Sequence, residues 1–286
     1  MPAERLRGEP VAKRLRESVR DRVARLDTPP TLGTVLASDD PSDARFVELK
    51  GEAAAAAGMT HRDRRLDPEA SPDRVYEAVG ELSRDPTVDA VFLQVPLPDG
   101  VALEAVRERI APEKDVDCFH PANLGRLVAG TPRFRPATPA AVLRLLSAYD
   151  VELAGAAVAV VGRSAVVGRP LANLLVAADA TVTVCHDRTA DLGAVTRRAD
   201  VVVTALGEPG CIDGSMLAPG SVVVDASSIR RETDDGVEVV GDVDQSSARS
   251  VAGALTPVPG GVGPVTLAAL LENTVTAAER RRGGPG

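Results

Sequence analysis

The chain has 286 residues, of which 44% are hydrophobic and 26% are charged, and its formal net charge is −8 at pH 7. This length suits one or two domains with substantial cores, and the acidic balance argues against nucleic acid as the main partner. No apolar run reaches the roughly 18 residues of a membrane span, so we expect no membrane partner. The first residues are charged and lack an apolar signal core, which predicts a cytoplasmic protein.

Cysteine and lysine are both scarce. The three cysteines lie in separate segments, without the spacing of a metal site or a disulfide framework. Of the 33 basic residues only Lys13, Lys50 and Lys114 are lysines, which leaves 30 arginines. Because lysine can lose its proton in a suitable environment and arginine cannot, the lysines are candidates for positions that arginine cannot serve.

The first part of the chain predicts a helix, a strand and a second helix. Residues 1–30 have the pattern of an amphipathic helix that the Pro29–Pro30 pair stops, and residues 31–37 form a short apolar strand. After an Asp-rich turn, Ser42 or Asp43 caps a helix that runs to about residue 58.

Phe46 and Lys50 lie four residues apart and therefore share one face of this second helix. Gly51 next to Lys50 leaves room for something flat, at a cost of about 1 kcal/mol in helix propensity. By itself this arrangement also suits a lysine whose stem covers an apolar face while its amine reaches water.

A helix from Pro72 to about Ser83 precedes an apolar strand over residues 88–94. Gln94 stands at the carboxyl end of that strand, where open α/β sheets place their ligands, although it could simply cap the strand. The next block, residues 112–126, has no helical or strand period and is predicted to be a polar loop. We expect no metal there because its acidic groups are sparse and Lys114 would compete with a cation.

The second half alternates strands and helices around a glycine turn. After a linking helix over residues 138–148, we predict strands at 156–161, 181–185, 200–204, 221–225 and 238–240, with helices at 168–178 and 190–198. The turn from Gly162 to Gly168 misses the GxGxxG spacing, so it fits either a dinucleotide site or a plain α/β crossover.

The last motif is TPVPGGVGPVT, residues 256–266, before a helix over residues 267–280. Its prolines and glycines argue against a regular element before Pro264, and successive glycines can turn several amides toward one ligand. Arg280–Arg282 are expected to be a frayed, solvated end.

These motifs together resemble one family. With Lys50 on its helix, the blocks LQVPLP (93–98), KDVDCFHPANLGRL (114–127), GRSAVVGRP (162–170) and TPVPGGVGPVT (256–266) are similar to the bifunctional methylenetetrahydrofolate dehydrogenase/methenyltetrahydrofolate cyclohydrolases. The resemblance covers residues 8–274. It implies a two-domain α/β fold: an N-terminal folate domain, residues 1–138, completed by a helix over 265–282, and a doubly wound Rossmann-type domain, residues 139–264, with a cleft between them. Such enzymes are usually homodimers through the Rossmann domain.

The resemblance also implies roles for residues. Lys50, Gln94 and Asp117 would be catalytic, with Asp117 holding the pterin ring. The folate would be bound by Phe46, Pro96, Leu97, Gly260, Gly261 and Pro264. The cofactor would be bound by Gly162, Arg163, Ser164, Val167, Gly168, Asp187, Arg188 and Ile229. The implied partners are tetrahydrofolate derivatives, and the implied pathway is one-carbon folate interconversion with a link to purine biosynthesis.

The sequence departs from the family pattern at two functional points. Phe46 replaces a tyrosine, which leaves the cyclohydrolase less secure than the dehydrogenase, and the stretch after Asp225 reads Ala226–Arg230 instead of Gly-Ile-Asn. For the cofactor, Arg163 and Ser164 match the residues that read a 2′-phosphate, whereas Asp187 suits a ribose 2′-hydroxyl and Arg188 offsets it. We therefore expect NADP, with NAD as the alternative.

Three other functions remain open from the sequence. The first is a dehydrogenase without cyclohydrolase activity, because of Phe46. The second is a non-catalytic folate- or nucleotide-binding protein, which the retention of Lys50 argues against. The third is a different Rossmann dehydrogenase, which would leave the KDVD and GGVG blocks unexplained.

Overall fold

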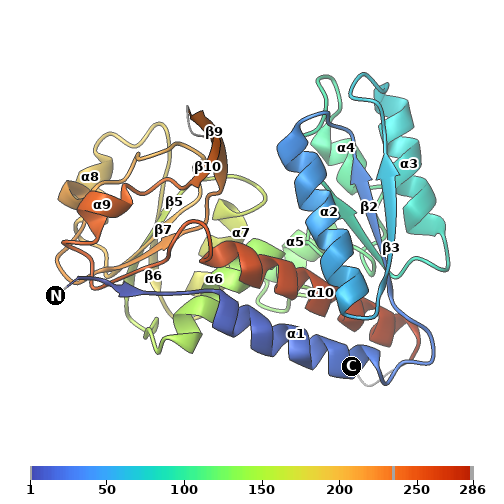
Figure 1. Cartoon of the computed structure of the whole chain (residues 1–286), viewed down its shortest axis with the longest axis horizontal. Helices are drawn as coiled ribbons and strands as arrows, with labels where there is room; N and C mark the ends of the chain where they lie inside the picture. Colours follow the sequence, from blue (N-terminus) through green and yellow to red (C-terminus); the bar gives the residue numbers. More distant parts are fainter. Residues whose placement is uncertain (1, 234–235, 284–286) are drawn as a thin grey trace. The chain divides into compact units, whose positions relative to one another are not determined.

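The computed structural model describes residues 2–233 and 236–283 (Figure 1). Its internal contacts divide the chain into two compact units, Met1–Lys13 with Thr138–Thr266 and Arg14–Ala137 with Leu267–Gly286. Within the described residues, no helix is long and apolar enough to cross a membrane.

The unit that holds residues 14–137 is built on a three-stranded parallel sheet of order β3-β2-β4. Its strands are β2 (Thr31–Leu36), β3 (Thr60–Arg65) and β4 (Ala90–Leu93). Its helices are α1 (Glu9–Val23, which begins in the other unit), α2 (Pro41–Ala56), α3 (Pro72–Arg84), α4 (Leu103–Arg107), α5 (Pro121–Val128) and most of α10 (Val262–Arg281).

Helices α2 and α3 cover opposite faces of this sheet. The glycine at 33 in β2 lies against Leu82 of α3, whereas the glycine at 51 in α2 lies against His61 of β3. Because side chains alternate along a strand, Thr34, His61, Phe92 and Gln94 all belong to the α2 side. A further apolar cluster joins α1, α2 and α10 through Val19, Ala54 and Leu271.

The other unit contains a six-stranded parallel sheet of order β1-β11-β8-β7-β5-β6. The strands are β1 (Glu4–Arg5), β5 (Ala157–Val161), β6 (Thr181–Cys185), β7 (Val201–Thr204), β8 (Val222–Asp225) and β11 (Ala254–Leu255). The helical segments are α6 (Ala137–Ala148), α7 (Gly168–Val176), α8 (Leu192–Thr196), η1 (Gly214–Met216) and α9 (Gln245–Ala248). An antiparallel hairpin of β9 (Ile229–Thr233) and β10 (Gly236–Val240) stands apart from the sheet ladder.

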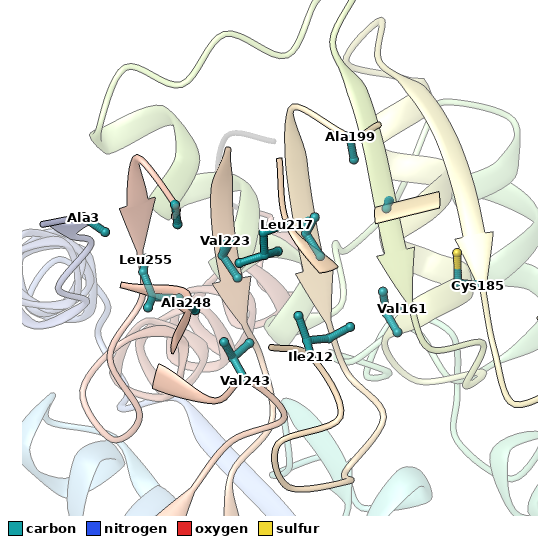
Figure 2. Packing of buried hydrophobic residues seen from close by; sticks show 13 residues of the cluster. Ala3, Val161, Cys185, Ala199, Ile212, Leu217, Val223, Val243, Ala248 and Leu255 are labelled. Carbon is teal, nitrogen blue, oxygen red and sulfur yellow. The ribbon is translucent and has the colours of Figure 1, made fainter. Parts of the chain in front are cut away.

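If β5, β6, β7, β8 and β11 are counted as strands 1 to 5, their order in the sheet is 2-1-3-4-5, which is a doubly wound order. The connection from β5 to β6 contains α7, and the connection from β6 to β7 contains α8 and runs in the opposite direction across the sheet. Because both crossovers are right-handed, α7 and α8 lie on opposite faces of the sheet. Figure 2 shows the apolar cluster of one face, to which Val161, Val223 and Leu255 contribute from three strands and Ala248 from α9. The direction of winding reverses between β5 and β7, which is where such sheets bind ligands.

Several predicted boundaries were wrong, most of them where the chain begins and ends. The first residues do not continue a helix over 1–30: Glu4 and Arg5 pair with Ala254 and Leu255, and α1 begins at Glu9. Residues 2–13 thus lie with the unit of the larger sheet. Helix α10 begins at Val262, two residues before Pro264, because proline is tolerated in a first helical turn.

The prediction of a solvated end at Arg280–Arg282 was also wrong. The Asp89 carboxylate is almost fully buried and accepts from Arg281 at 2.9 Å and from Arg282 at 2.6 Å. Arg281 also donates to the Val88 carbonyl, at 2.7 Å. These charge-assisted bonds tie the end of α10 to the start of β4.

Candidate active site

Helix α2 brings Lys50 to the end of strand β4. The helix starts at Pro41, and its cap is Asp40, which accepts from the Ser42 amide at 2.6 Å and lies earlier in the chain than the predicted caps. The Lys50 Nζ donates to the Gln94 Oε1 at 3.1 Å and to the Phe46 carbonyl at 3.4 Å. It also lies 4.5 Å from the centre of the Phe92 ring. The amine of this half-buried side chain is therefore held by Gln94 and Phe46 and packs against the Phe92 ring.

Gln94 is the first residue after β4 and is 8% exposed. Its Nε2 donates to the Asp43 Oδ1 at 3.0 Å and to the Val95 carbonyl at 2.9 Å. The Val95–Pro96 peptide bond is cis, and Pro96 and Leu97 follow it into the loop. The structure thus brings Lys50 and Gln94 together, and it adds Asp43, which the sequence analysis considered only as a helix cap.

Asp117 lies in the same unit and is buried, with its Oδ1 accepting from the Ala137 amide at 2.7 Å. Burial raises the pKa of this carboxyl group to about 7, while the Ala137 amide and the Lys50 charge oppose the rise. Burial also lowers the pKa of Lys50 to about 8, partly offset by the negative charges of Asp117 and Asp43. Both groups can therefore change protonation state near neutral pH.

The block around Asp117 is fixed by its neighbour Asp115. The Asp115 carboxylate accepts from the Phe119 and His120 amides and from the Asn123 side chain, each at 2.8 Å. The prediction of an irregular loop through residue 126 was wrong from Pro121 onward, where α5 begins with His120 as its cap. The sequence hid this helix because it has only eight residues.

Lys114 has a structural position. Its Nζ donates to the Asp85 carbonyl at 2.6 Å, and the residue is 4% exposed. Of the two lysines in this unit, Lys50 is therefore the one that contacts Gln94.

The flat group beside Gly51 is a histidine ring. A Cβ at position 51 would lie 2.5 Å from the His61 Nδ1, so glycine is required for the ring to pack against α2. The Thr34 hydroxyl lies 2.8 Å from the His61 Nε2 and 3.2 Å from the Asp63 Oδ1, within hydrogen-bond distance of both. His61 was not predicted from the sequence, where the helical glycine beside Lys50 was the signal for a flat group packed against the helix.

In the other unit, the turn after β5 has the close contacts of a ligand cradle. Gly162 has φ +133°, and a Cβ there would meet the Ala205 carbonyl oxygen at 2.5 Å. A Cβ at Gly168 would meet the Gly162 carbonyl oxygen at 2.0 Å. The Ser164 hydroxyl accepts from the Val167 and Gly168 amides, at 3.0 and 3.3 Å, where α7 begins. The turn leads into the N-terminus of α7, where the helix dipole favours an anion such as a phosphate.

Arg163 and Asp187 meet at the ends of β5 and β6. The Arg163 Nη2 lies 2.5 Å from the Asp187 Oδ1, and the Arg188 Nε lies 3.4 Å from the Asp187 Oδ2. The single carboxylate therefore faces two exposed guanidinium groups, and the local charge is net positive.

Asp242 joins the loops that follow β7 and β8. Its carboxylate is fully buried and accepts from the amides of Leu206 at 2.7 Å, Gly207 at 2.9 Å and Glu208 at 2.8 Å. It also accepts from the Ser227 hydroxyl at 2.7 Å. Ser227 lies in the stretch that departs from the family pattern, and the structure gives it this role. Ile229, in the same stretch, is half-buried at the start of β9.

The residues predicted from the GGVG block lie with the larger sheet, in a different unit from Phe46, Pro96 and Leu97. The Gly260 carbonyl accepts from the Gly8 amide at 2.8 Å. A Cβ at Gly261 would meet the Pro257 carbonyl oxygen at 2.6 Å. Pro264 stands in the first turn of α10. Among the described residues, no group of three or more His, Cys, Asp or Glu could hold a metal ion.

The fold and these two sites define a class of protein: a two-unit α/β enzyme with a nucleotide-type turn in one unit and a Lys–Gln–Asp site in the other. Within that class, the chain belongs to the tetrahydrofolate dehydrogenase/cyclohydrolase family. Residues 6–117 match the model of the family's catalytic domain, and residues 136–282 match that of its NAD(P)-binding domain. The predicted resemblance and the two-domain α/β class are confirmed.

Relatives and solved structures cover nearly the whole chain. The bifunctional protein FolD of Haloquadratum walsbyi is 47% identical over 277 residues, which is 94% of this chain and 89% of that protein. The FolD protein of Bordetella bronchiseptica is 46% identical over 283 residues, 98% of this chain and 99% of that protein. The structure of the Trypanosoma brucei methylenetetrahydrofolate dehydrogenase-cyclohydrolase, complexed with NADP cofactor and an inhibitor, is similar with a TM-score of 0.93 and 35% identity, covering 98% of each chain.

Proposed function

We propose that this chain oxidises 5,10-methylenetetrahydrofolate to 5,10-methenyltetrahydrofolate with NADP+, and hydrolyses that product to 10-formyltetrahydrofolate. The observation that carries the proposal is the 3.1 Å contact between the Lys50 amine and Gln94 in a chain that matches both domains of the family. The product would supply one-carbon units for purine biosynthesis.

Lys50 is proposed to move the protons of the hydrolysis. As water attacks the methenyl carbon, the neutral amine accepts a proton from it, and the resulting ammonium returns a proton to the ring nitrogen that leaves as the ring opens. The pKa of about 8 makes both forms available near neutral pH. Gln94 accepts a hydrogen bond from the amine and keeps it in place.

Phe46 is compatible with this hydrolysis. Its backbone carbonyl accepts from the Lys50 amine at 3.4 Å, and its ring centre lies 5.8 Å from the same amine. The residue is 37% exposed, and its ring can stack on an aromatic part of the folate. A dehydrogenase without cyclohydrolase activity is therefore the less favoured reading.

Asp117 is proposed to bind the pterin ring. As an anion it accepts from the ring's N–H donors in a charge-assisted pair. Because burial raises its pKa to about 7, a donor pair from the substrate would stabilise the charged form that burial penalises. In the same unit, Pro96 and Leu97 are proposed to line the folate, while the roles of Gly260, Gly261 and Pro264 in folate binding stay predictions.

The cofactor is proposed to bind the turn after β5. The Gly162 and Gly168 backbones, Ser164 and Val167 would hold its phosphates at the start of α7, and Ile229 would contact the nicotinamide half. When bound, the nicotinamide supplies the acceptor for the hydride. We favour NADP because Arg163 and Arg188 flank the Asp187 carboxylate and together attract a 2′-phosphate.

Two further properties are proposed. The chain would act as a homodimer through the unit of the larger sheet, because β6 is an edge strand of the described sheet and carries Val184 with 38% exposure. It would work in the cytoplasm, since Cys118, Cys185 and Cys211 are all free thiols and such cysteine usage fits a reducing compartment.

A two-cofactor assay tests the activity. We expect methylenetetrahydrofolate to be oxidised with a higher kcat/KM for NADP+ than for NAD+, and authentic methenyltetrahydrofolate to be hydrolysed without cofactor. Hydrolysis no faster than in buffer would restrict the protein to the dehydrogenase, and a strong NAD+ preference would overturn the cofactor assignment.

Replacement of the amine tests the proposed chemistry. Lys50→Met keeps the length of the side chain and removes the proton-transfer group, so we expect hydrolysis to fall by at least ~100-fold, within the range of general acid–base catalysis. Lys13→Met, on α1, is the matched control and should hydrolyse at the wild-type rate. Full activity in Lys50→Met would refute the role.

A further inference from the structure

A second carboxylate, Asp43, belongs to the Lys50 site without taking part in the steps above. It is 8% exposed, and it lies on α2 seven residues before Lys50, on the same face of the helix. Its Oδ1 accepts from the Gln94 Nε2 at 3.0 Å, and its Oδ2 accepts from the Ser38 hydroxyl at 2.8 Å.

These contacts determine which way the Gln94 amide faces. The Gln94 Nε2 carries two hydrogens, which go to Asp43 and to the Val95 carbonyl. An ionised carboxylate and a carbonyl can only accept, so the opposite orientation would place the amide oxygen against two acceptors. It would also turn the NH2 group toward the Lys50 ammonium. With Asp43 in place, the amide oxygen faces Lys50 at 3.1 Å.

Resting on the proposed function, we propose that Asp43 is a positioning residue for Lys50: it holds the Gln94 amide with its oxygen toward the amine and adds a negative charge behind it. Asp43 acts through its hydrogen bonds and the electrostatic field of its charge, and its two oxygens accept hydrogen bonds from Gln94 and Ser38. No proton needs to pass through it.

The charges around Lys50 determine in which direction its pKa changes when the Asp43 charge is removed. Asp43 on α2 and Asp117, between α4 and α5, raise the pKa of Lys50, and burial lowers it. His61 on β3 faces the same region; burial lowers the pKa of the histidine, Asp63 opposes this, and the Lys50 charge lowers it further. Removal of the Asp43 charge alone should therefore move the titration of Lys50 to lower pH.

The rarity of lysine allows this titration to be measured directly. Protein labelled with 13C at the lysine ε-carbon gives signals from only Lys13, Lys50 and Lys114, and Lys50→Met identifies the Lys50 signal. We expect Asp43→Asn to lower the titration midpoint of Lys50 by about one pH unit, the size of shift that one nearby charge causes. Asp39→Asn, which removes an exposed charge from the preceding turn, is the matched control and should move it by less than ~0.2 pH units, because exposed charges are screened.

The hydrolysis rate tests the orientation separately from the charge. Asparagine can still present an oxygen to the Gln94 Nε2, whereas valine cannot. We expect Asp43→Asn to keep hydrolysis within about threefold of Asp39→Asn, and Asp43→Val to lower it about tenfold, the loss typical of one charge-assisted hydrogen bond.

Two results would overturn the assignment: a Lys50 midpoint that is the same in Asp43→Asn as in Asp39→Asn, or an Asp43→Val enzyme as fast as Asp39→Asn. If Asp43→Val does not fold, the Asp43→Asn titration still decides whether the Asp43 charge acts on Lys50. Failure of the proposed function would be recognised independently, as wild-type protein that lacks hydrolysis while its Lys50 still titrates as described.

Discussion

Burial moves the pKa values of Asp117 and Lys50 toward each other, to about 7 and about 8. The same desolvation acts on both groups, and because one is an acid and the other a base, its effects have opposite signs. Near neutral pH, small changes in the site can therefore redistribute protons between substrate, water and amine. Burial of the carboxylate also has a consequence for stability.

The pH dependence of stability follows from the raised pKa of Asp117. Its folded-state pKa of about 7 lies above the ordinary value of 3.8, so its contribution is complete below about pH 4 and lost as pH rises through 7. An uncharged amide at this position has no such loss, because it does not titrate. We expect Asp117→Asn to gain stability over wild type between about pH 4 and 7, by up to about 4 kcal/mol at pH 8, although folate binding weakens.

Urea unfolding of both proteins at pH 5 and pH 8, without folate, measures this gain. If Asp117→Asn is less stable than wild type by the same margin at pH 8 and at pH 5, burial does not raise the pKa of Asp117 in the folded protein.

Asp242 is the second residue whose effect can be predicted. Its carboxylate binds three successive amides of the loop after β7 and the Ser227 hydroxyl after β8, at the edge where the cofactor is proposed to bind. We expect Asp242→Asn to raise the KM for NADP+ about tenfold, because an amide oxygen accepts less strongly than a carboxylate.

The KM for the folate and the rate of cofactor-independent hydrolysis should change by less than about twofold in Asp242→Asn, because the loops that Asp242 holds belong to the cofactor side. Ser246→Ala on the nearby α9 is the matched control. Equal losses in both activities would assign Asp242 to general folding and not to the cofactor loops.

At the scale of elements, helix α2 depends on a glycine that its helix propensity disfavours. Alanine in place of glycine usually stabilises a helix by about 1 kcal/mol. In α2, however, a Cβ at position 51 would lie 2.5 Å from the His61 ring, which Thr34 holds from the other side. We therefore expect Gly51→Ala to destabilise the protein and to shift the turn that carries Lys50.

Removal of the ring should reverse this effect. In Gly51→Ala combined with His61→Ala, the clash is absent, and the double variant should be more stable than His61→Ala alone. Thermal unfolding of the four proteins measures the cycle. An increase in Tm for Gly51→Ala in the wild-type background would mean that the ring moves aside at little cost.

At the scale of the whole molecule, the edge strand β6 predicts the assembly. Strand β6 bonds to β5 on one side in the described sheet, and Val184 on it is 38% exposed. A charge on such an edge opposes pairing with another strand. We expect Val184→Arg to convert a dimer to a monomer in light scattering, whereas Val237→Arg on the β9–β10 hairpin should leave the dimer intact. A dimeric Val184→Arg protein would place the interface elsewhere.

Helices and strands with local signals could be predicted from the sequence. The strand over residues 181–185 is found as predicted, and the helices beginning at Pro72 and Gly168 start at the expected residues. Glycine, proline and apolar periodicity act within a few residues, so they can be interpreted without knowledge of the fold. The family motifs likewise gave Lys50 and Gln94 as partners, and the structure places them in contact.

Contacts between residues that are separate in sequence became known only from the folded structure. Strand β1 exists because Glu4 and Arg5 pair with residues 254 and 255, and a two-residue strand carries no periodicity to recognise. Other contacts likewise join separate parts of the chain. Arg281 pairs with Asp89, Asp43 bonds to Gln94, and Asp242 bonds to the Leu206 amide. The His61 ring packs against Gly51 of another element. Polar side chains at such positions look like ordinary surface residues in a sequence, and it is burial by the folded chain that gives them specific partners.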